Sequence, residues 1–90
     1  MPAEIDTDYI RELRKLLDSL TPGPWTSFVE GRDHSSGSSF IRTRGDDIEL
    51  TGASAADQDF IARARQDIPA LLDEIDRLRS QLRSQAQAAE

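Results

Sequence analysis

Residues 54–85 read SAADQDFIARARQDIPALLDEIDRLRSQLRSQ, and this stretch decides how the chain is organised. Its apolar residues recur at alternating intervals of three and four, which is the pattern of a coiled-coil seam. Isoleucine at the first position of the seven-residue repeat, with leucine at the fourth, favours a parallel pair of helices. The stretch therefore predicts a helix that joins copies of the chain. The seam residues that we assign to this interface are Ile68, Leu71, Ile75, Leu78 and Leu82.

Pro69 lies in the middle of this helical pattern. A proline inside a helix removes one backbone hydrogen bond, and its ring clashes with the preceding turn. We therefore expect a long C-terminal helix that is broken or kinked near Pro69. We favour a break, in which Asp67 caps the second segment and Pro69 occupies its first turn, where proline is tolerated.

The first part of the stretch has an alternative use within its own chain. Residues from Phe60 to Leu72 can complete a core, which would leave Ile75, Leu78 and Leu82 for a partner. We predict both uses together. Residues 1–74 are then a small α+β domain, and residues 75–90 form a projecting, coiled-coil-like helix with a frayed tail.

An N-terminal helix is predicted over residues 7–20. Apolar residues recur there at helical spacing, and Asp6 or Thr7 is suited to cap the first turn. The segment Thr21-Pro22-Gly23-Pro24 ends the helix, because proline disfavours helical geometry in the residue before it. Trp25 follows directly and is expected either to anchor the core or to offer an aromatic surface to a ligand.

The middle of the chain loses this periodicity and favours strands. Residues 25–30 and 39–43 are rich in strand formers, and residues 48–51 alternate between apolar and polar. Turn-forming residues separate the three segments. The predicted fold class is therefore α+β, with an N-terminal helix, a three-stranded antiparallel meander and the long C-terminal helix.

Composition limits the partners and the compartment. The chain has 90 residues, a net charge of −6 and no cysteine. A disulfide framework and a cysteine-based zinc site are excluded, and a nucleic-acid partner is not expected of so acidic a chain. We see neither a membrane-spanning run nor a signal peptide and expect a cytoplasmic protein. A domain this small is marginally stable alone, so self-association into a dimer or tetramer would help it.

No set of residues points to catalysis. The glycines are spaced as turns and do not form a phosphate loop, and His34 is the only histidine. We therefore expect no enzyme, no cofactor and no metal site. The alternative function is binding of a small anionic ligand or nucleotide signal at a subunit interface. Its candidate residues are Trp25, Arg32, Arg42 and Arg44, whose arginines are suited to bind a phosphate or carboxylate. We favour the simpler interpretation, in which these arginines only keep the sheet soluble.

Two segments resemble the Ead-like family of small phage and prophage proteins. Leu20-Thr21-Pro22-Gly23-Pro24-Trp25 is similar to the family's A-T-P-G-P-W opening. Residues 57–65 with 68–75 are similar to its D-A-A-F-I-A-A-A-R and P-A-L-L-x-E-I ending, except that Arg63 and Arg65 stand where alanine is frequent. The resemblance implies a phage accessory protein that binds a host or defence factor, and it brings no catalytic residues. We expect a non-enzymatic, oligomeric interaction protein.

Overall fold

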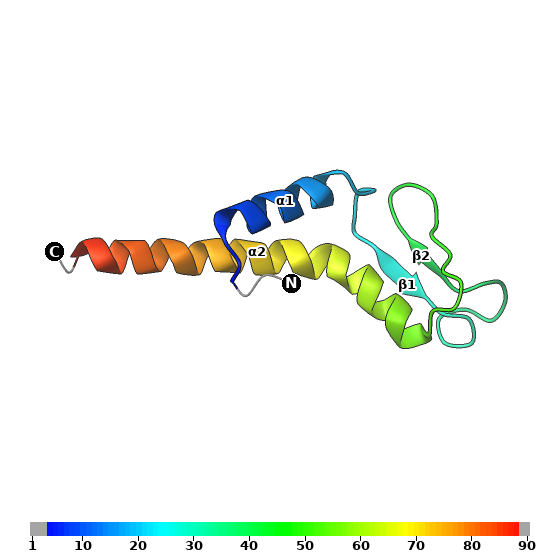
Figure 1. The fold of residues 1–90 in the computed structure, drawn as a ribbon. Coiled ribbons are helices and arrows are strands. Elements are labelled where there is room, and N and C mark those ends of the chain that lie inside the picture. The colour runs from blue at the N-terminus through cyan, green and yellow to red at the C-terminus, as the bar shows by residue number, and fades with distance from the viewer. Residues whose placement is uncertain (1–3, 89–90) are drawn as a thin grey trace.

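The computed structural model describes residues 4–88, which form two helices and a small sheet at one end of the longer helix (Figure 1). The elements follow the order α1 (Thr7–Asp18), β1 (Thr26–Phe28), β2 (Phe40–Arg42) and α2 (Ala55–Ala88). The molecule measures 64 × 25 × 21 Å. Its long dimension follows α2, with the sheet at the start of that helix and α1 alongside its middle (Figure 1).

The predicted three-stranded meander is wrong, because the described chain forms a two-stranded antiparallel sheet. Thr26 pairs with Arg42 and Phe28 with Phe40. The expected third strand is reduced to one bridge, in which Ile48 exchanges two backbone hydrogen bonds of 2.8 and 2.9 Å with Ile41. The alternation of residues 48–51 instead leaves Ile48 and Leu50 half-buried while the chain turns toward α2.

Helix α1 begins where the capping residues predict. The Asp6 carboxylate accepts a 2.8 Å hydrogen bond from the amide of Tyr9, which satisfies one of the free N–H groups of the first turn. The helix ends at Asp18, two residues before the predicted end at Leu20. The amides of Ser19 and Leu20 turn back to carbonyls three residues earlier, so the last turn tightens before the proline-rich segment.

Helix α2 is continuous from Ala55 to Ala88, so the break that we favoured at Pro69 is wrong. Ser54 and Asp57 form a reciprocal cap at its start, with hydrogen bonds of 3.0 and 3.1 Å. Pro69 offers no amide proton to the carbonyl of Arg65, and the ribbon changes direction in this yellow to yellow-green region (Figure 1). The proline therefore bends the helix without dividing it.

The core between sheet and helix is thin and partly polar. Ile41 is completely buried, and Ala62 and Leu72 of α2 are nearly so. The buried amide of Gln58 donates to the carbonyls of Phe28 and Phe40 at 3.2 and 3.1 Å. One glutamine thus ties both strands to α2, since each strand carbonyl accepts from the same side chain.

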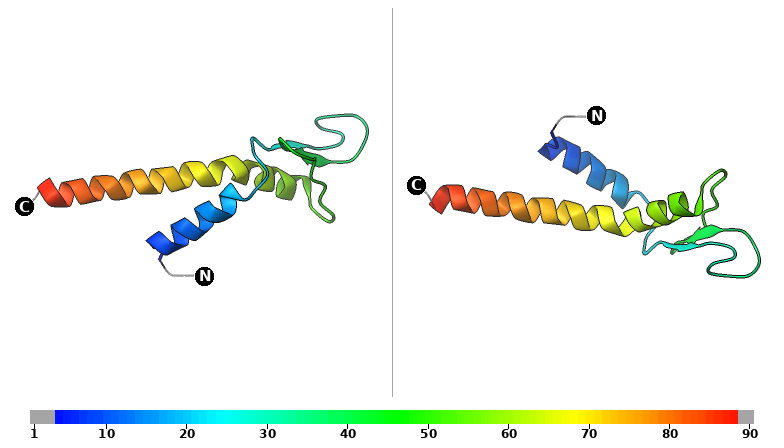
Figure 2. Two further views of the ribbon diagram at one scale, coloured as in Figure 1. Left: turned by 90° about the horizontal axis from the view of Figure 1, so that it is seen from above. Right: turned by 90° about the horizontal axis from the view of Figure 1, so that it is seen from below.

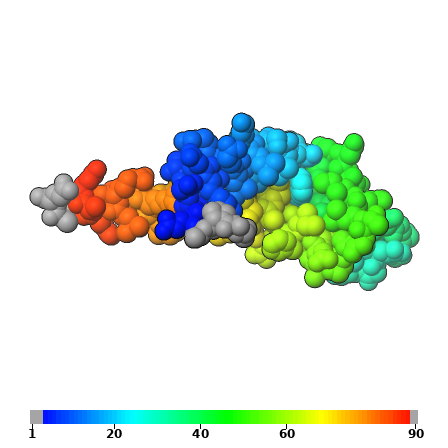
Figure 3. All heavy atoms as spheres, in the orientation of Figure 1, coloured from blue at the N-terminus to red at the C-terminus, as the bar shows by residue number. Residues whose placement is uncertain are grey.

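The last turns of α2 extend beyond α1 (Figure 3). The side chain of Arg79 still donates to the carbonyl of Ile5, so the segment before α1 reaches past residue 74, where we expected the domain to end. The helix continues through the predicted frayed region as far as Ala88, and residues 89–90 of the expected tail lie outside the described residues. Within residues 4–88, neither helix is both long enough and apolar enough to cross a membrane.

Candidate functional site

Trp25 lies where the chain leaves the proline-rich turn and reaches α2. Its indole N–H donates to the carbonyl of Thr21 at 3.0 Å. Its backbone N–H donates to the side-chain oxygen of Gln66 at 2.7 Å, and its carbonyl accepts from the same side chain at 3.1 Å. Trp25 is half-buried and fixes this connection to the helix.

Arg32 is already bound to carboxylates of its own chain. Its two terminal nitrogens donate to the two oxygens of Asp59 at 2.7 and 2.9 Å, and Asp33 accepts from it at 2.9 Å. The guanidinium of Arg32, helped by a hydrogen bond from Ser27, lowers the pKa of Asp59 to about 2. The pKa of Asp33 is also lowered, first by Arg32 and then by the backbone N–H of Val29. Both carboxylates raise the pKa of Arg32, so its positive charge is paired with acidic groups of its own chain.

Arg42 and Arg44 face other surroundings. The guanidinium of Arg42 lies over the ring of Phe28, 4.7 Å from its centroid, and the rings of Phe28 and Phe40 stack at 5.2 Å. Arg44 lies in the turn after β2, where its amide donates to the carbonyl of Pro22. Trp25, Arg32 and Arg42 thus contact different groups of the described residues, and no one group is contacted by all three.

The seam of α2 runs along its outer side with much of its apolar surface exposed. The exposed fractions are 58% for Leu71, 45% for Leu78 and 65% for Leu82, and Ile61 is also exposed. Ile68 and Ile75 are half-buried. The residues that we predicted for the oligomer interface therefore form a continuous strip that the chain leaves largely uncovered.

A second apolar strip lies on α1, and sequence reasoning missed it. Tyr9 and Leu16 are exposed, Leu16 by 60%, and with the half-buried Leu13 they border a hollow of about 650 Å³. We had assigned all the apolar residues of this helix to one face. The sequence does carry a signal for this strip, which is the width of the apolar face around the helix. The face covers more of the helix circumference than one contact can bury, with apolar residues at 9, 10, 13, 16, 17 and 20. We call Tyr9, Leu13 and Leu16 the α1 strip.

The α1 strip lies away from the charged edge of the contact between the helices. Arg14 bridges this edge to α2, with nitrogen–oxygen distances of 3.1 Å to Asp73 and 2.7 Å to Asp76. Each residue turns a helix by about 100°, so Leu16 stands roughly 200° around α1 from Arg14. The strip therefore occupies the opposite edge of the contact.

The seam of α2 lies at that same opposite edge. Leu72 is buried against the rest of the chain, and Asp73 and Asp76 stand to one side of it. Leu71 and Leu78 stand to the other side by the same helical spacing of about 100° per residue. The α1 strip and the seam thus form one two-helix apolar surface. Figure 2 shows that α1 diverges from α2 toward the N-terminal end of α1.

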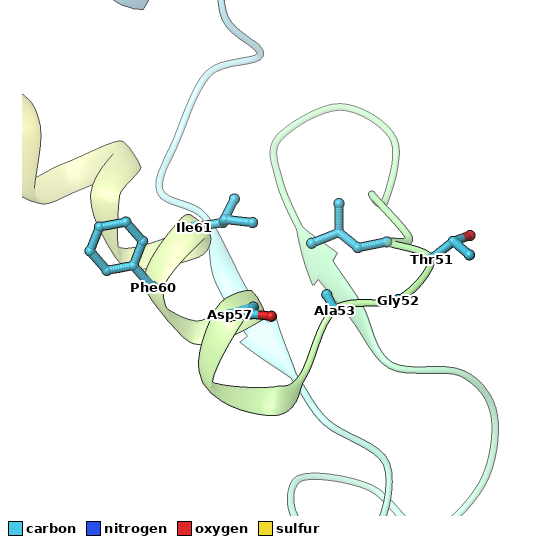
Figure 4. A pocket seen from close by; sticks show the side chains of 7 residues that line it. Thr51, Gly52, Ala53, Asp57, Phe60 and Ile61 are labelled. Carbon is cyan, nitrogen blue, oxygen red and sulfur yellow. The ribbon is translucent and has the colours of Figure 1, made fainter. Parts of the chain in front are cut away.

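A smaller hollow lies at the end of this surface, where α2 meets the sheet. Ile61 and Phe60 of the helix and the loop of residues 50–53 line a hollow of about 470 Å³. Figure 4 shows Ile61 turned toward the loop and the ring of Phe60 turned away from it. Phe60 is 73% exposed, the largest fraction among the described bulky apolar residues. Because Ile61 lies one seven-residue repeat before Ile68, the hollow continues the line of the seam.

Glu74 and Arg79 of α2 each have a partner within the chain. Arg77 donates to Glu74 within α2, whereas Arg79 turns toward the carbonyl of Ile5. The pKa of Glu74 is lowered and that of Arg77 raised by this contact. The flank of α2 that carries Arg79 is therefore occupied by the chain's own N-terminal segment.

The comparisons with family models, curated proteins and solved structures find nothing that matches this chain. Within residues 4–88 there is also no group of three or more acidic or histidine side chains placed to hold a metal ion. Within residues 4–88, the two-helix apolar surface gathers exposed apolar side chains from both helices, namely Tyr9, Leu16, Leu71, Leu78 and Leu82.

Proposed function

We propose that the chain is a non-enzymatic interaction protein that self-associates through α2. The observation that carries this proposal is the exposed seam, whose leucines at 71, 78 and 82 are about half or more exposed. A row of large apolar side chains at coiled-coil spacing is stabilised when a partner removes it from water, by about 25 cal/mol per Å² buried. Within the seam, Ile68 and Ile75 are half-buried by the rest of the chain, whereas the three leucines are exposed.

The thin core supports the same proposal. Ile41 is the one bulky apolar side chain of the described residues that is fully buried. A chain of this size buries a small share of its surface, so association adds apolar contact that the monomer lacks. Self-association is then part of what keeps the fold stable, and the stability should rise with protein concentration.

The broader role is that of a phage or prophage accessory protein that acts in the host cytoplasm on a host or defence factor. Its support is the resemblance of the Leu20–Trp25 segment and of the start of α2 to the Ead-like family. The sheet end, with its loop of residues 31–39, is the part left free for such a partner when the seam is paired.

Light scattering coupled to gel filtration tests the self-association. The wild-type chain should elute at a multiple of its own mass at tens of micromolar, and the double variant Ile75→Asp/Leu78→Asp should elute as a monomer because two charges enter the seam. Ser80→Asp/Ser84→Asp is the matched control, since it adds the same two charges on exposed positions outside the seam. A monomeric wild type, or a double variant of unchanged mass, would overturn the proposal.

A further inference from the structure

We propose that two copies of α2 pair in the antiparallel direction, so that their α1 helices meet and complete a four-helix bundle. The inference rests on the proposed self-association and adds to it an orientation, a register and a second contact surface. It replaces the parallel pair that the isoleucine and leucine pattern favours.

Helix α1 decides the orientation because it occupies one flank of the seam. The side chain of Arg65 donates to the carbonyl of Thr21 at 3.3 Å, Arg79 donates to that of Ile5, and Leu72 is buried between them. In a parallel pair this flank would meet the opposite flank of the partner. The two α1 helices would then lie on opposite sides of the pair, and the α1 strip would remain in water.

An antiparallel pair brings the two α1 strips together. The twofold axis then runs perpendicular to α2, and it places the same flank of both helices on the same side of the pair. The α1 strip faces the seam side of its own hairpin, so the Tyr9 and Leu16 side chains of the two copies face each other. The exposed residues of the α1 strip and of the seam are then covered by one contact.

The register supports this geometry. In an antiparallel seam the first repeat position of one helix opposes the fourth position of the other, which sets Leu71 opposite the partner's Ile75 and Ile68 opposite the partner's Leu78. These pairs centre the axis at residue 73. The part of α2 that the segments on either side of α1 contact, from Arg65 at Thr21 to Arg79 at Ile5, has its midpoint at residue 72. Both α1 helices therefore lie at the same level, where they can touch.

The exposed area of the two-helix apolar surface and the charges beside it fit a second copy of the chain as its binding partner. The six exposed side chains of the surface offer each copy on the order of 600 Å², against roughly 800 Å² per partner in an interface of standard size. Those six are Tyr9, Leu16, Ile61, Leu71, Leu78 and Leu82. Two acids, Asp67 and Glu74, lie on the flank of α2 that α1 does not occupy. They are paired with Arg63 and Arg77 of the same helix. When this flank meets the same flank of the partner, no row of unpaired like charges faces another. The dipoles of antiparallel helices also attract each other.

Distances between spin labels on introduced cysteines test the orientation, since the chain contains no native cysteine. Ser84 lies eleven residues from the proposed axis, so two labels at Ser84→Cys should be separated by about 33 Å along an antiparallel pair, from the helical rise of 1.5 Å per residue. In a parallel pair they would stay below roughly 25 Å, because packed helices are 8–10 Å apart. Ala70→Cys is the control position. It lies three residues from the axis and should give a short distance in both arrangements.

The outcomes separate this inference from the proposal on which it rests. A long distance at residue 84 with a short one at residue 70 supports the antiparallel bundle. Short distances at both positions would overturn the orientation and leave self-association standing. Labels without any dipolar coupling at residue 70, on a chain that scatters as a monomer, would overturn both.

A substitution on α1 tests the second contact. Leu16→Glu should raise the dissociation constant of the dimer at least about tenfold, because it places a charge where the two α1 strips meet. Lys15→Glu changes the charge more but lies on the face turned away from the strip, and it should alter the constant less than about threefold. Circular dichroism at high concentration confirms that both variants fold. Equal effects of the two variants would overturn the α1 contact.

Discussion

The guanidinium of Arg32 and the carboxylate of Asp59 are joined by two parallel hydrogen bonds of 2.7 and 2.9 Å. The two residues are 27 positions apart, so this pair fastens the loop between β1 and β2 to the first turns of α2. Paired geometry of this kind is stronger and more directional than a single contact. Arg32, which we predicted as a ligand-binding residue, thus has two carboxylate partners within its own chain.

The first prediction concerns acid stability. The pKa of Asp59 is lowered to about 2 from an ordinary value of 3.8, so its ion pair contributes stability above pH 4 that is lost as the pH falls toward 2. Asp59→Asn should be less stable than wild type at pH 7, and the difference should vanish near pH 2. Thermal unfolding from pH 7 to 2 measures this difference. Asp47→Asn is the control at an exposed turn position, and a gap of constant size down to pH 2 would contradict the assignment.

The second prediction concerns the buried amide of Gln58. Gln58→Glu replaces a donor to three oxygens, those of Ser27, Phe28 and Phe40, by an acceptor. We expect a loss of about 3 kcal/mol, because buried partners are left unsatisfied and a charge is buried among them. Urea unfolding at fixed protein concentration measures it. Gln81→Glu makes the same change on the exposed side of α2 and should cost less than about 0.5 kcal/mol; similar losses for both would argue against the role of Gln58.

The third prediction concerns the packing of Ile41. Ile41→Val removes one methyl group from a completely buried side chain and should cost about 1 kcal/mol. Ile48→Val removes the same group from the neighbouring, half-buried residue and should cost less. Chemical unfolding of the two variants side by side gives the comparison. An equal or larger effect at Ile48 would show that the core is centred elsewhere.

The fourth prediction concerns the bend in α2. Pro69→Ala restores an amide donor to the carbonyl of Arg65 and replaces a poor helix former by a good one, a difference of up to about 3 kcal/mol. We expect a stronger helical circular dichroism signal and a longer particle in small-angle scattering. Pro22→Ala, outside both helices, is the control. Lower stability of Pro69→Ala would show that α1 and the sheet need the bend to contact α2 at the same time.

Parts of this fold follow from residue order alone. The period of three and four residues predicts α2 and its seam, and Asp6, Ser54 and Asp57 predict the two helix starts, because these patterns act over a few neighbouring residues. Pro69 has two local solutions, a break or a bend. Two features flank the bend. Arg65, before Pro69, donates to the carbonyl of Thr21, and Leu72, after Pro69, is buried.

The parts that sequence reasoning missed depend on distant residues. The alternation of residues 48–51 fits a strand equally well as a segment that half-buries Ile48 and Leu50 beside α2. The partner of Arg32 is not evident until the chain has folded back on itself. The α1 strip emerges only when Arg14, bound to Asp73 and Asp76, shows which edge of the helix contact is charged.

Gln58 and Gln66 have a consequence for how this protein changes over evolutionary time. Both side chains grip the sheet segment by its backbone, at the carbonyls of Phe28 and Phe40 and at the amide and carbonyl of Trp25. Backbone groups are the same whatever residue carries them, so the attachment survives substitution of the outward-facing side chains. Substitutions on the outer sheet face and in the loop that follows β1 are therefore expected to leave both attachments of this segment to α2 intact.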